Sequence, residues 1–332
     1  MPLIRIWAVE HALASGIAAP VDILMAANRL AAGSLSPSER CEKPFTWRVE
    51  SIDGKPVRTA SGQIVEVDGR IDGKSIADAI WLAGPFVSDI EKLLSDPKLL
   101  TPLLEALRHQ HARGTLIAAY CTGAFLLAEA GLLDGRLATT HWSKSTSFQA
   151  RYPDVQLRAS DVVTEQDGVL CGGAVTSYQN LALRIVEKLG TAKLAAATAK
   201  VMLIDINRVS QDSFIDFSRT DRLEHDDPVV ARAQRWMERH LRERFDLTRL
   251  SDHLAVSERT INRRFKQAVG APPLRYLQTL RIEVAKRLLE EKRLSLDAVC
   301  ERVGYTDISG FRQLFKRVTG VSPGEYRRRF AR

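Results

Sequence analysis

One cysteine stands where a strand-like run meets a helix-like run, a placement that suits nucleophilic chemistry. Cys121 follows the apolar run IAAY (117–120) and precedes the helical pattern TGAFLLAEAGLL (122–133). The small residues Ala119 and Gly123 beside it permit the sharp turn that exposes such a side chain at the end of a sheet. The N-terminus of the helix is expected to lower the pKa of the Cys121 thiol and to favour thiolate. The pattern predicts an elbow that carries a reactive group or lines a pocket.

The elements that must hold this elbow alternate along the first 200 residues. β-rich runs predict strands at 3–9, 45–52, 79–84 and 115–121, and helical spacing of apolar residues predicts helices at 19–33, 98–114, 122–133 and 178–190. The segment 62–71 predicts a small hairpin that turns at Asp68–Gly69. Strands that alternate with helices of this length indicate an α/β fold, a mostly parallel sheet covered by helices on both faces.

The elbow region resembles a known family. The stretch CTGAFLLAEAGLLDGRLATTHW (121–142) is similar to ThiJ/PfpI and class I glutamine amidotransferase-like domains. The resemblance implies a flavodoxin-like sensory domain over residues 1–204, with Gly84 where that family's backbone amides face the cysteine. Hydrolytic members carry His directly after the cysteine, where this chain has Thr122. They also carry an acidic residue four positions before the proline of the first helix, where this chain has Gly16.

Because a cysteine nucleophile needs a base or an oriented partner, the missing residues argue against catalysis. We therefore expect a catalytically inactive domain, not an enzyme, whose elbow lines a ligand pocket formed by Gly84, Cys121, Thr122 and His141. Two alternatives stay open. His141 could serve Cys121 in a Cys-dependent hydrolase or amidase tethered to DNA, or the elbow could be purely structural.

Charge divides the chain unevenly. The 332 residues carry 48 Lys and Arg against 40 Asp and Glu, a net charge of +8. Residues 1–227 hold 24 basic and 28 acidic residues, net −4, whereas 228–332 hold 24 and 12, net +12. A third of the chain carries all of the positive excess, the electrostatic pattern of a module that binds a polyanion. A length of 332 residues is typical of about two domains, and we expect a linker at 205–227 between them.

The basic third contains an internal repeat with a shift of 50 residues. The frame F-K-x-x-x-G-x-x-P-x-x-Y begins at Phe265 and again at Phe315. Ahead of each copy lie a short helical run, a turn and a second helical run, with Ser257 and Asp307 as expected N-caps of the second helices. These are two helix-turn-helix units, and the amphipathic run 272–291 between them predicts one long connecting helix.

This region resembles the AraC/XylS transcription regulators over about residues 228–330, with GYTDISGFRQLFKRVTGVSPGEYRRRF carrying the signature of the second unit. The resemblance implies that each second helix enters the major groove of double-stranded DNA. Carried over by position, the base-contacting residues are Arg259, Asn262, Arg263, Ser309, Arg312 and Gln313. Arg suits guanine, and Asn and Gln suit adenine. Lys266, Lys316 and Arg317 are expected on phosphate.

The second unit departs from the family at two positions. The family usually has Arg where Gln313 stands and a large aromatic residue where Gly310 stands. These differences concern the base preference of the second helix-turn-helix unit, whereas its fold is expected to be unchanged.

Several site classes are not indicated. Cys41, Cys121, Cys171 and Cys300 lie far apart with no CxxC pair, and the histidines share no ligand spacing, so we expect neither metal nor cofactor. The longest uncharged run is too short to span a membrane. These observations predict a cytoplasmic, reduced protein. The resemblance to AraC/XylS regulators implies, in addition, an activator that contacts RNA polymerase, forms a homodimer and responds to a small-molecule effector.

Overall fold

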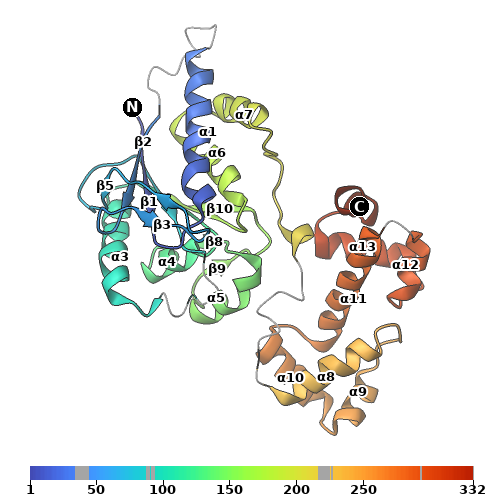
Figure 1. Ribbon diagram of the computed structural model, residues 1–332. Helices are drawn as coiled ribbons and strands as arrows, with labels where there is room; N and C mark the ends of the chain where they lie inside the picture. Colours follow the sequence, from blue (N-terminus) through green and yellow to red (C-terminus); the bar gives the residue numbers. More distant parts are fainter. Residues whose placement is uncertain are drawn as a thin grey trace. The chain divides into compact units, whose positions relative to one another are not determined.

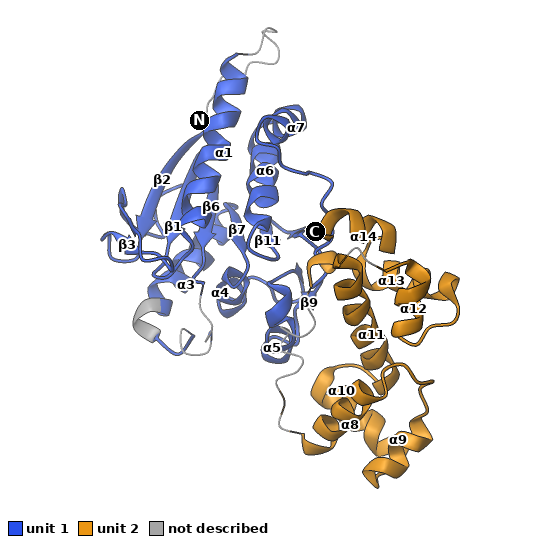
Figure 2. Cartoon of the chain, turned by 45° about the vertical axis from the view of Figure 1, so that its right-hand side comes forward, with its two compact units in different colours: residues 1–211 blue, residues 212–332 orange. Residues whose placement is uncertain are grey.

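The computed structural model describes residues 1–33, 45–86, 90, 94–215, 225, 227–291 and 294–331. Cys41 therefore lies outside the described residues. The chain forms two compact units, Met1–Gln211 and Asp212–Arg332, which Figure 2 colours blue and orange. No helix among the described residues is both long enough and apolar enough to cross a membrane.

The first unit is built on a sheet of seven described strands in the order β10-β11-β7-β6-β1-β2-β5. Their bounds are β1 Leu3–Ala8, β2 Thr46–Ser51, β5 Gly69–Arg70, β6 Ala79–Ala83, β7 Leu116–Tyr120, β10 Val163–Gln166 and β11 Val169–Gly172. All neighbours run parallel except β10 and β11. The expected mostly parallel sheet is confirmed.

Helices cover both faces of this sheet (Figure 1). One face carries α1 Ala14–Ala32, α6 Ser177–Leu189 and α7 Ala192–Val201, and the other carries α3 Pro97–Ala112 and α4 Gly123–Glu129. Consecutive strand residues serve opposite layers: Trp81 packs with α1 and α6, whereas Ile80 and Leu82 pack with α3 and α4. Two buried faces explain why these strands are continuously apolar rather than alternating.

The smaller elements of this unit are β3 Val57–Arg58, β4 Ile64–Val65, β8 Leu137–Ala138, β9 Gln156–Leu157, η2 Trp142–Lys144 and α5 Ser145–Arg151. The hairpin predicted around Asp68–Gly69 is wrong. β4 pairs with β3, and β5 joins the main sheet parallel to β2. The reason is that Asp68 binds Val49 on β2 twice, through its carboxylate (2.8 Å) and its backbone amide (2.6 Å).

The second unit is helical. Its elements are η3 Asp212–Phe214, α8 Pro228–Arg239, α9 Leu247–Leu254, α10 Glu258–Val269, α11 Pro273–Glu290, α12 Leu296–Arg302, α13 Ile308–Thr319 and α14 Pro323–Phe330. Described apolar side chains gather in two separate clusters, one from α8 to the first half of α11, the other from the second half of α11 to α14. Each cluster is the core of one helix-turn-helix unit.

The segment expected as the linker divides between the units. Gln211 is fully buried in the first unit, where its amide oxygen accepts from Ala174 N (2.9 Å) and its amide nitrogen donates to Ala159 O (2.6 Å). Residues 212–215 belong to the second unit, where Ile215 accepts a hydrogen bond from Lys286 on α11. Residues 216–224 and 226 lie outside the described part of the chain.

Candidate functional site

The 50-residue repeat corresponds to a repeated aromatic contact. Phe265 on α10 meets Tyr276 on α11 edge-on, with ring centroids 5.8 Å apart, and Phe315 on α13 meets Tyr326 on α14 in the same way at 5.5 Å. Both phenylalanines are buried. In each unit this pair fastens the second helix of the motif to the helix that follows it, which fixes the direction in which its polar face points.

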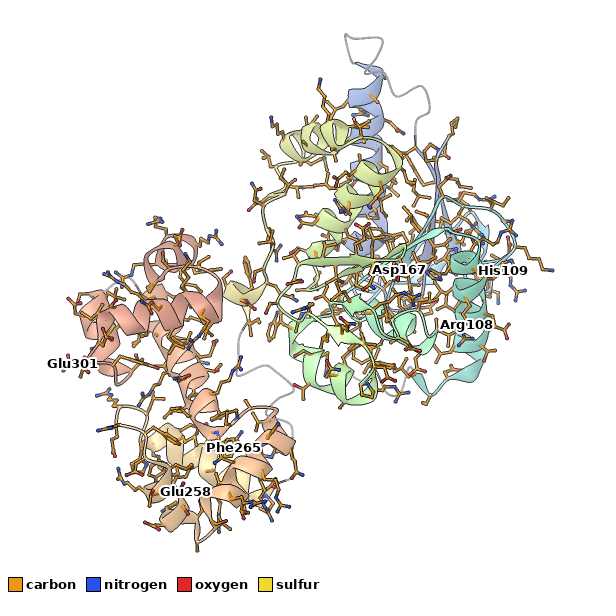
Figure 3. The ribbon with its side chains drawn as sticks, turned by 180° about the vertical axis from the view of Figure 1, so that it is seen from behind. Arg108, His109, Asp167, Glu258, Phe265 and Glu301 are labelled. Atoms are coloured by element: carbon orange, nitrogen blue, oxygen red, sulfur yellow. The ribbon has the colours of Figure 1, made fainter. Side chains whose placement is uncertain are left out.

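Both second helices begin at the predicted caps. Ser257 caps α10 by accepting from Thr260 N (3.3 Å), and Asp307 caps α13 by accepting from Ser309 N (2.9 Å). Each helix ends at a glycine in the left-handed region, Gly270 and Gly320. Figure 3 labels Glu258, at the start of α10, and Phe265 two turns along the same helix.

The proposed base-contacting side chains lie on the solvent side of these helices. Five of the six are exposed, namely Arg259, Arg263, Ser309, Arg312 and Gln313. The sixth, Asn262, is half-buried and donates to the backbone carbonyl of Glu258 (3.1 Å). The expected phosphate contacts Lys266, Lys316 and Arg317 are exposed as well. Two similar polar faces are therefore open to a long ligand.

The glycine that departs from the family pattern fits its own surroundings. A Cβ built on Gly310 would lie 2.6 Å from Oδ2 of Asp307, the cap of the same helix. A large side chain at this position would require the Asp307 carboxylate to move. Gly310 and the aspartate cap thus belong together, and the start of α13 keeps helical geometry without the aromatic residue.

The elbow in the first unit has the predicted backbone. β7 ends at Tyr120, α4 begins at Gly123, and Cys121 between them has φ 56°, a left-handed conformation that is strained for a residue with a side chain. Gly84 packs directly against the start of α4, because its Cβ would lie 2.6 Å from Cα of Gly123. The backbone segments around Gly84 and Gly123 approach this closely only because both residues lack side chains.

The prediction that the Cys121 thiol is ionised is wrong. Cys121 is only 4% exposed, and burial raises its pKa to about 11 in spite of hydrogen bonding to Thr122. Removal of water from around the sulfur disfavours the charged form more than the hydrogen bonds to Thr122 favour it. The Cys121 thiol is therefore protonated near neutral pH.

The other predicted pocket residues are engaged with backbone. Thr122 Oγ1 donates to Pro85 O (2.5 Å), next to Gly84, and Thr140 Oγ1 donates to Cys121 O (2.9 Å). The Nδ1 atom of His141 interacts with the hydroxyl (2.8 Å) and amide (3.2 Å) of Ser143. Burial, aided by the charge of Lys144, lowers the pKa of His141 to about 4. Gly84, Cys121 and Thr122 are brought together, while the bond to Cys121 comes from Thr140 rather than His141.

Sequence reasoning missed the aromatic residues beneath the elbow. Tyr120 is 2% exposed, and its hydroxyl finds no hydrogen-bond partner among the described residues. Its ring packs against Trp81 (5.9 Å) and edge-on against Tyr178 (5.7 Å). Burial raises the pKa of Tyr120. The only sequence signal was that Tyr120 directly precedes Cys121, and a tyrosine in a strand does not by itself indicate a functional site.

A groove of about 730 Å³ also went unpredicted. It lies between α6, α7, β10 and the segment 206–209, with Leu183 and Ile206 among its apolar walls. Arg184 (2.7 Å) and Lys188 (2.5 Å) both pair with Glu165 at this place. Although burial acts in the opposite direction, these cations hold the pKa of the Glu165 carboxyl below its ordinary value.

Two family descriptions match the chain, the DJ-1/PfpI family over residues 30–188 and the helix-turn-helix domain over residues 250–329. Among curated proteins, the HTH-type transcriptional regulator CdhR of Pseudomonas aeruginosa is 28% identical over 85% of this chain and 82% of its own length. The HTH-type transcriptional regulator GbdR of the same species is 24% identical over 94% and 80%.

A solved structure agrees on the fold of the first unit. DJ-1beta of Drosophila melanogaster superposes with a TM-score of 0.50 at 17% identity, covering 61% of this chain and 98% of its own. The fold, the doubled motif and the regulators that match most of the chain together define a class of DNA-binding transcription regulators. This chain is a transcription regulator that combines an AraC-type helix-turn-helix domain with a DJ-1/PfpI domain.

Proposed function

We propose that this regulator recognises a specific promoter sequence by placing α10 and α13 in neighbouring major grooves of one DNA duplex. The observation that carries the proposal is the pair of equivalent helices, each fastened by an aromatic contact and each with an exposed polar face. The net charge of +12 on residues 228–332 supplies the attraction to phosphate.

Six side chains are assigned to base edges. Arg259, Asn262 and Arg263 act in the first unit, and Ser309, Arg312 and Gln313 act in the second. Lys266, Lys316 and Arg317 bind phosphate, which positions the helices without reading sequence. We propose double-stranded promoter DNA as the partner and the cytoplasm as the location of the protein.

The first unit is proposed as a sensor that binds a small metabolite beside Gly84, Cys121, Thr122 and His141. Its place supports this, because ligands of open parallel sheets bind at the carboxyl ends of the strands. A protonated, buried Cys121 supports binding rather than catalysis. The effector acts by preferring one state of the chain, since only differential affinity shifts an equilibrium.

The sensor and the DNA-binding unit are directly joined in sequence at Gln211 and Asp212. Gln211 is held by the sensor and Ile215 by α11, so few residues separate the two anchors. We propose that this junction passes the effector-bound state to the promoter, where a homodimer activates transcription through contact with RNA polymerase. Two-fold assemblies are the commonest oligomers of soluble proteins.

Selection from a random DNA pool tests the DNA-reading proposal. Each bound copy of the chain should recover two short blocks of preferred bases. The variant Arg263→Ala should lose preference within one block, and Arg312→Ala within the other. Recovery of no preferred sequence by the wild type would contradict the proposal.

The sensor proposal is tested on Cys121→Ala. Promoter output is measured for the wild type and the variant, together with hydrolysis of a chromogenic amide and of a chromogenic ester. We expect no turnover that depends on Cys121. Turnover that disappears in the variant while promoter control persists would instead favour the tethered hydrolase.

A further inference from the structure

Arg281, in the middle of α11, touches both helix-turn-helix units. It is 7% exposed, and its guanidinium donates to the backbone carbonyls of Leu241 (2.8 Å) and Glu243 (2.5 Å), which follow α8 in the first helix-turn-helix unit. The same guanidinium lies 5.3 Å from the ring centroid of Tyr305, in the turn of the second helix-turn-helix unit. One buried cation therefore binds the two units to each other across the connecting helix.

The position of Arg281 coincides with the gap between the two apolar cores. On α11 the first cluster extends to the partly buried Leu280, and the second begins at Ile282. Apolar packing holds each unit together but leaves the joint between them to α11 and to polar contacts. A single helix bends more readily than a packed interface, so a strap at this point decides how stiff the joint is.

A direct backbone contact lies beside the strap. Gly304, just before Tyr305, has φ +76°, and a Cβ built on it would lie 2.5 Å from the carbonyl oxygen of Arg242. Arg242 stands between the two residues that Arg281 binds. Gly304 thus lets the turn of the second helix-turn-helix unit lie directly against the backbone of the first helix-turn-helix unit. Arg281 holds these two backbone segments in contact through charge-assisted hydrogen bonds.

We propose that Arg281 and Gly304 form a lock that sets the angle and distance between α10 and α13, and thereby the spacing of the two base blocks that the protein accepts. The proposal rests on the DNA-reading function proposed above. One extra base pair turns the second block by about 34° around a duplex of about 10.5 base pairs per turn. A locked pair of helices cannot follow that rotation, whereas a jointed pair can. Arg281 is a positioning residue in this scheme.

The test compares spacing rather than affinity alone. The selected site is prepared with its native spacing and with one base pair inserted or removed between the blocks. Dissociation constants are measured for the full-length wild type, Arg281→Gln, Gly304→Ala and the control Arg275→Gln, an exposed arginine on the same helix. Circular dichroism melting identifies the variants that fold.

We expect the wild type and Arg275→Gln to prefer native spacing by about 30-fold or more, the loss of roughly one block of base contacts. In Arg281→Gln and Gly304→Ala the preference should fall to about fivefold or less, while binding to an isolated single block stays within about twofold. A loosened joint moves the ratio, whereas general destabilisation lowers all affinities together.

Folded variants that keep the wild-type spacing ratio would overturn the lock. So would a wild type that binds its site specifically but tolerates altered spacing, a result that needs no variant to fold. A wild type with no specific site would instead contradict the DNA-reading function itself. The two failures are therefore distinguishable.

Discussion

A Cβ built on Gly16 would lie 1.6 Å from the hydroxyl oxygen of Tyr120, so the tyrosine fills the space beside the elbow that a side chain at position 16 would need. Position 16 is where the resemblance to hydrolytic relatives implies an acidic residue. In this chain the place is closed by a ring that also packs on Trp81, whose indole nitrogen donates to Gly16 O (2.9 Å). The acid is missing, and so is the room for it.

The closed space predicts a large cost for a small substitution. Gly16→Ala should lower the free energy of unfolding by about 1–3 kcal/mol, the usual cost of overpacking a core. Gly33→Ala, at the end of the same helix, is the matched control, because its Cβ would meet nothing closer than 3.4 Å. Denaturant unfolding of the two variants measures the difference. Equal stabilities would mean that Tyr120 moves aside freely and that the space is open.

The buried Cys121 predicts slow labelling. Iodoacetamide should modify Cys121 of the native protein much more slowly than after unfolding at pH 7.5, since the thiol pKa is raised to about 11. Mass spectrometry of the peptide that contains Cys121 reports the rate. Fast native labelling with an apparent pKa below 8 would support the hydrolase alternative.

The same shift fixes a dependence of stability on pH. The unfolded thiol loses its proton near its ordinary pKa of 9.0, and the folded thiol near 11. Between these two pKa values the unfolded state binds fewer protons than the folded state. The free energy of unfolding is therefore highest below about pH 9 and falls as the pH rises toward 11. Cys121→Ala should show a shallower loss over that window, and an identical slope would contradict the shift.

Base-contacting and phosphate-contacting residues should behave differently. Arg263→Ala is expected to cost about 1–3 kcal/mol of discrimination at one base position while leaving random-sequence binding nearly unchanged. Lys316→Ala should weaken specific and random DNA alike and reduce the slope of log K against log salt by about one. Titrations at four salt concentrations separate the two. Equal losses on specific and random DNA for Arg263→Ala would count against base reading.

The linker's attachment to α11 rests on a buried ion pair. Lys286 is 4% exposed and donates to both oxygens of Glu283 (3.0 and 3.1 Å) as well as to Ile215. Lys286→Met should cost about 3–5 kcal/mol of stability, because it removes the cation that binds both oxygens of the buried Glu283 carboxylate. The double variant Lys286→Met/Glu283→Leu should recover most of that loss. A double variant no more stable than the single one would show that the pair contributes through something other than charge.

Local patterns predicted the parts of the fold that depend on local rules. The strand–turn–helix around Cys121 and the caps Ser257 and Asp307 each follow from a few adjacent residues. The repeat predicted two helix-turn-helix units because both copies obey the same spacing. The hairpin at Asp68–Gly69 failed because Val49, 19 residues earlier, binds Asp68 more favourably than a local turn would.

Long-range contacts explain what the sequence did not show. Gly16 contacts Tyr120, which lies about half a domain further along the chain, and Arg281 binds Leu241 across a separation of 40 residues. The Cys121 thiol was assigned the wrong ionisation because burial depends on three-dimensional packing, which no adjacent residue reveals. The segment 205–211 looks like a linker by composition, yet the amide of Gln211 binds it into the first unit.

Hydroxyl-radical footprinting of the full chain on its selected DNA site tests the central claim most directly. Two helices held side by side should protect two backbone patches on one face of the duplex, centred about 10 base pairs apart. Arg263→Ala and Arg312→Ala should each weaken a different patch. A single protected patch, or uniform protection without dependence on sequence, would contradict the account that both units read DNA together.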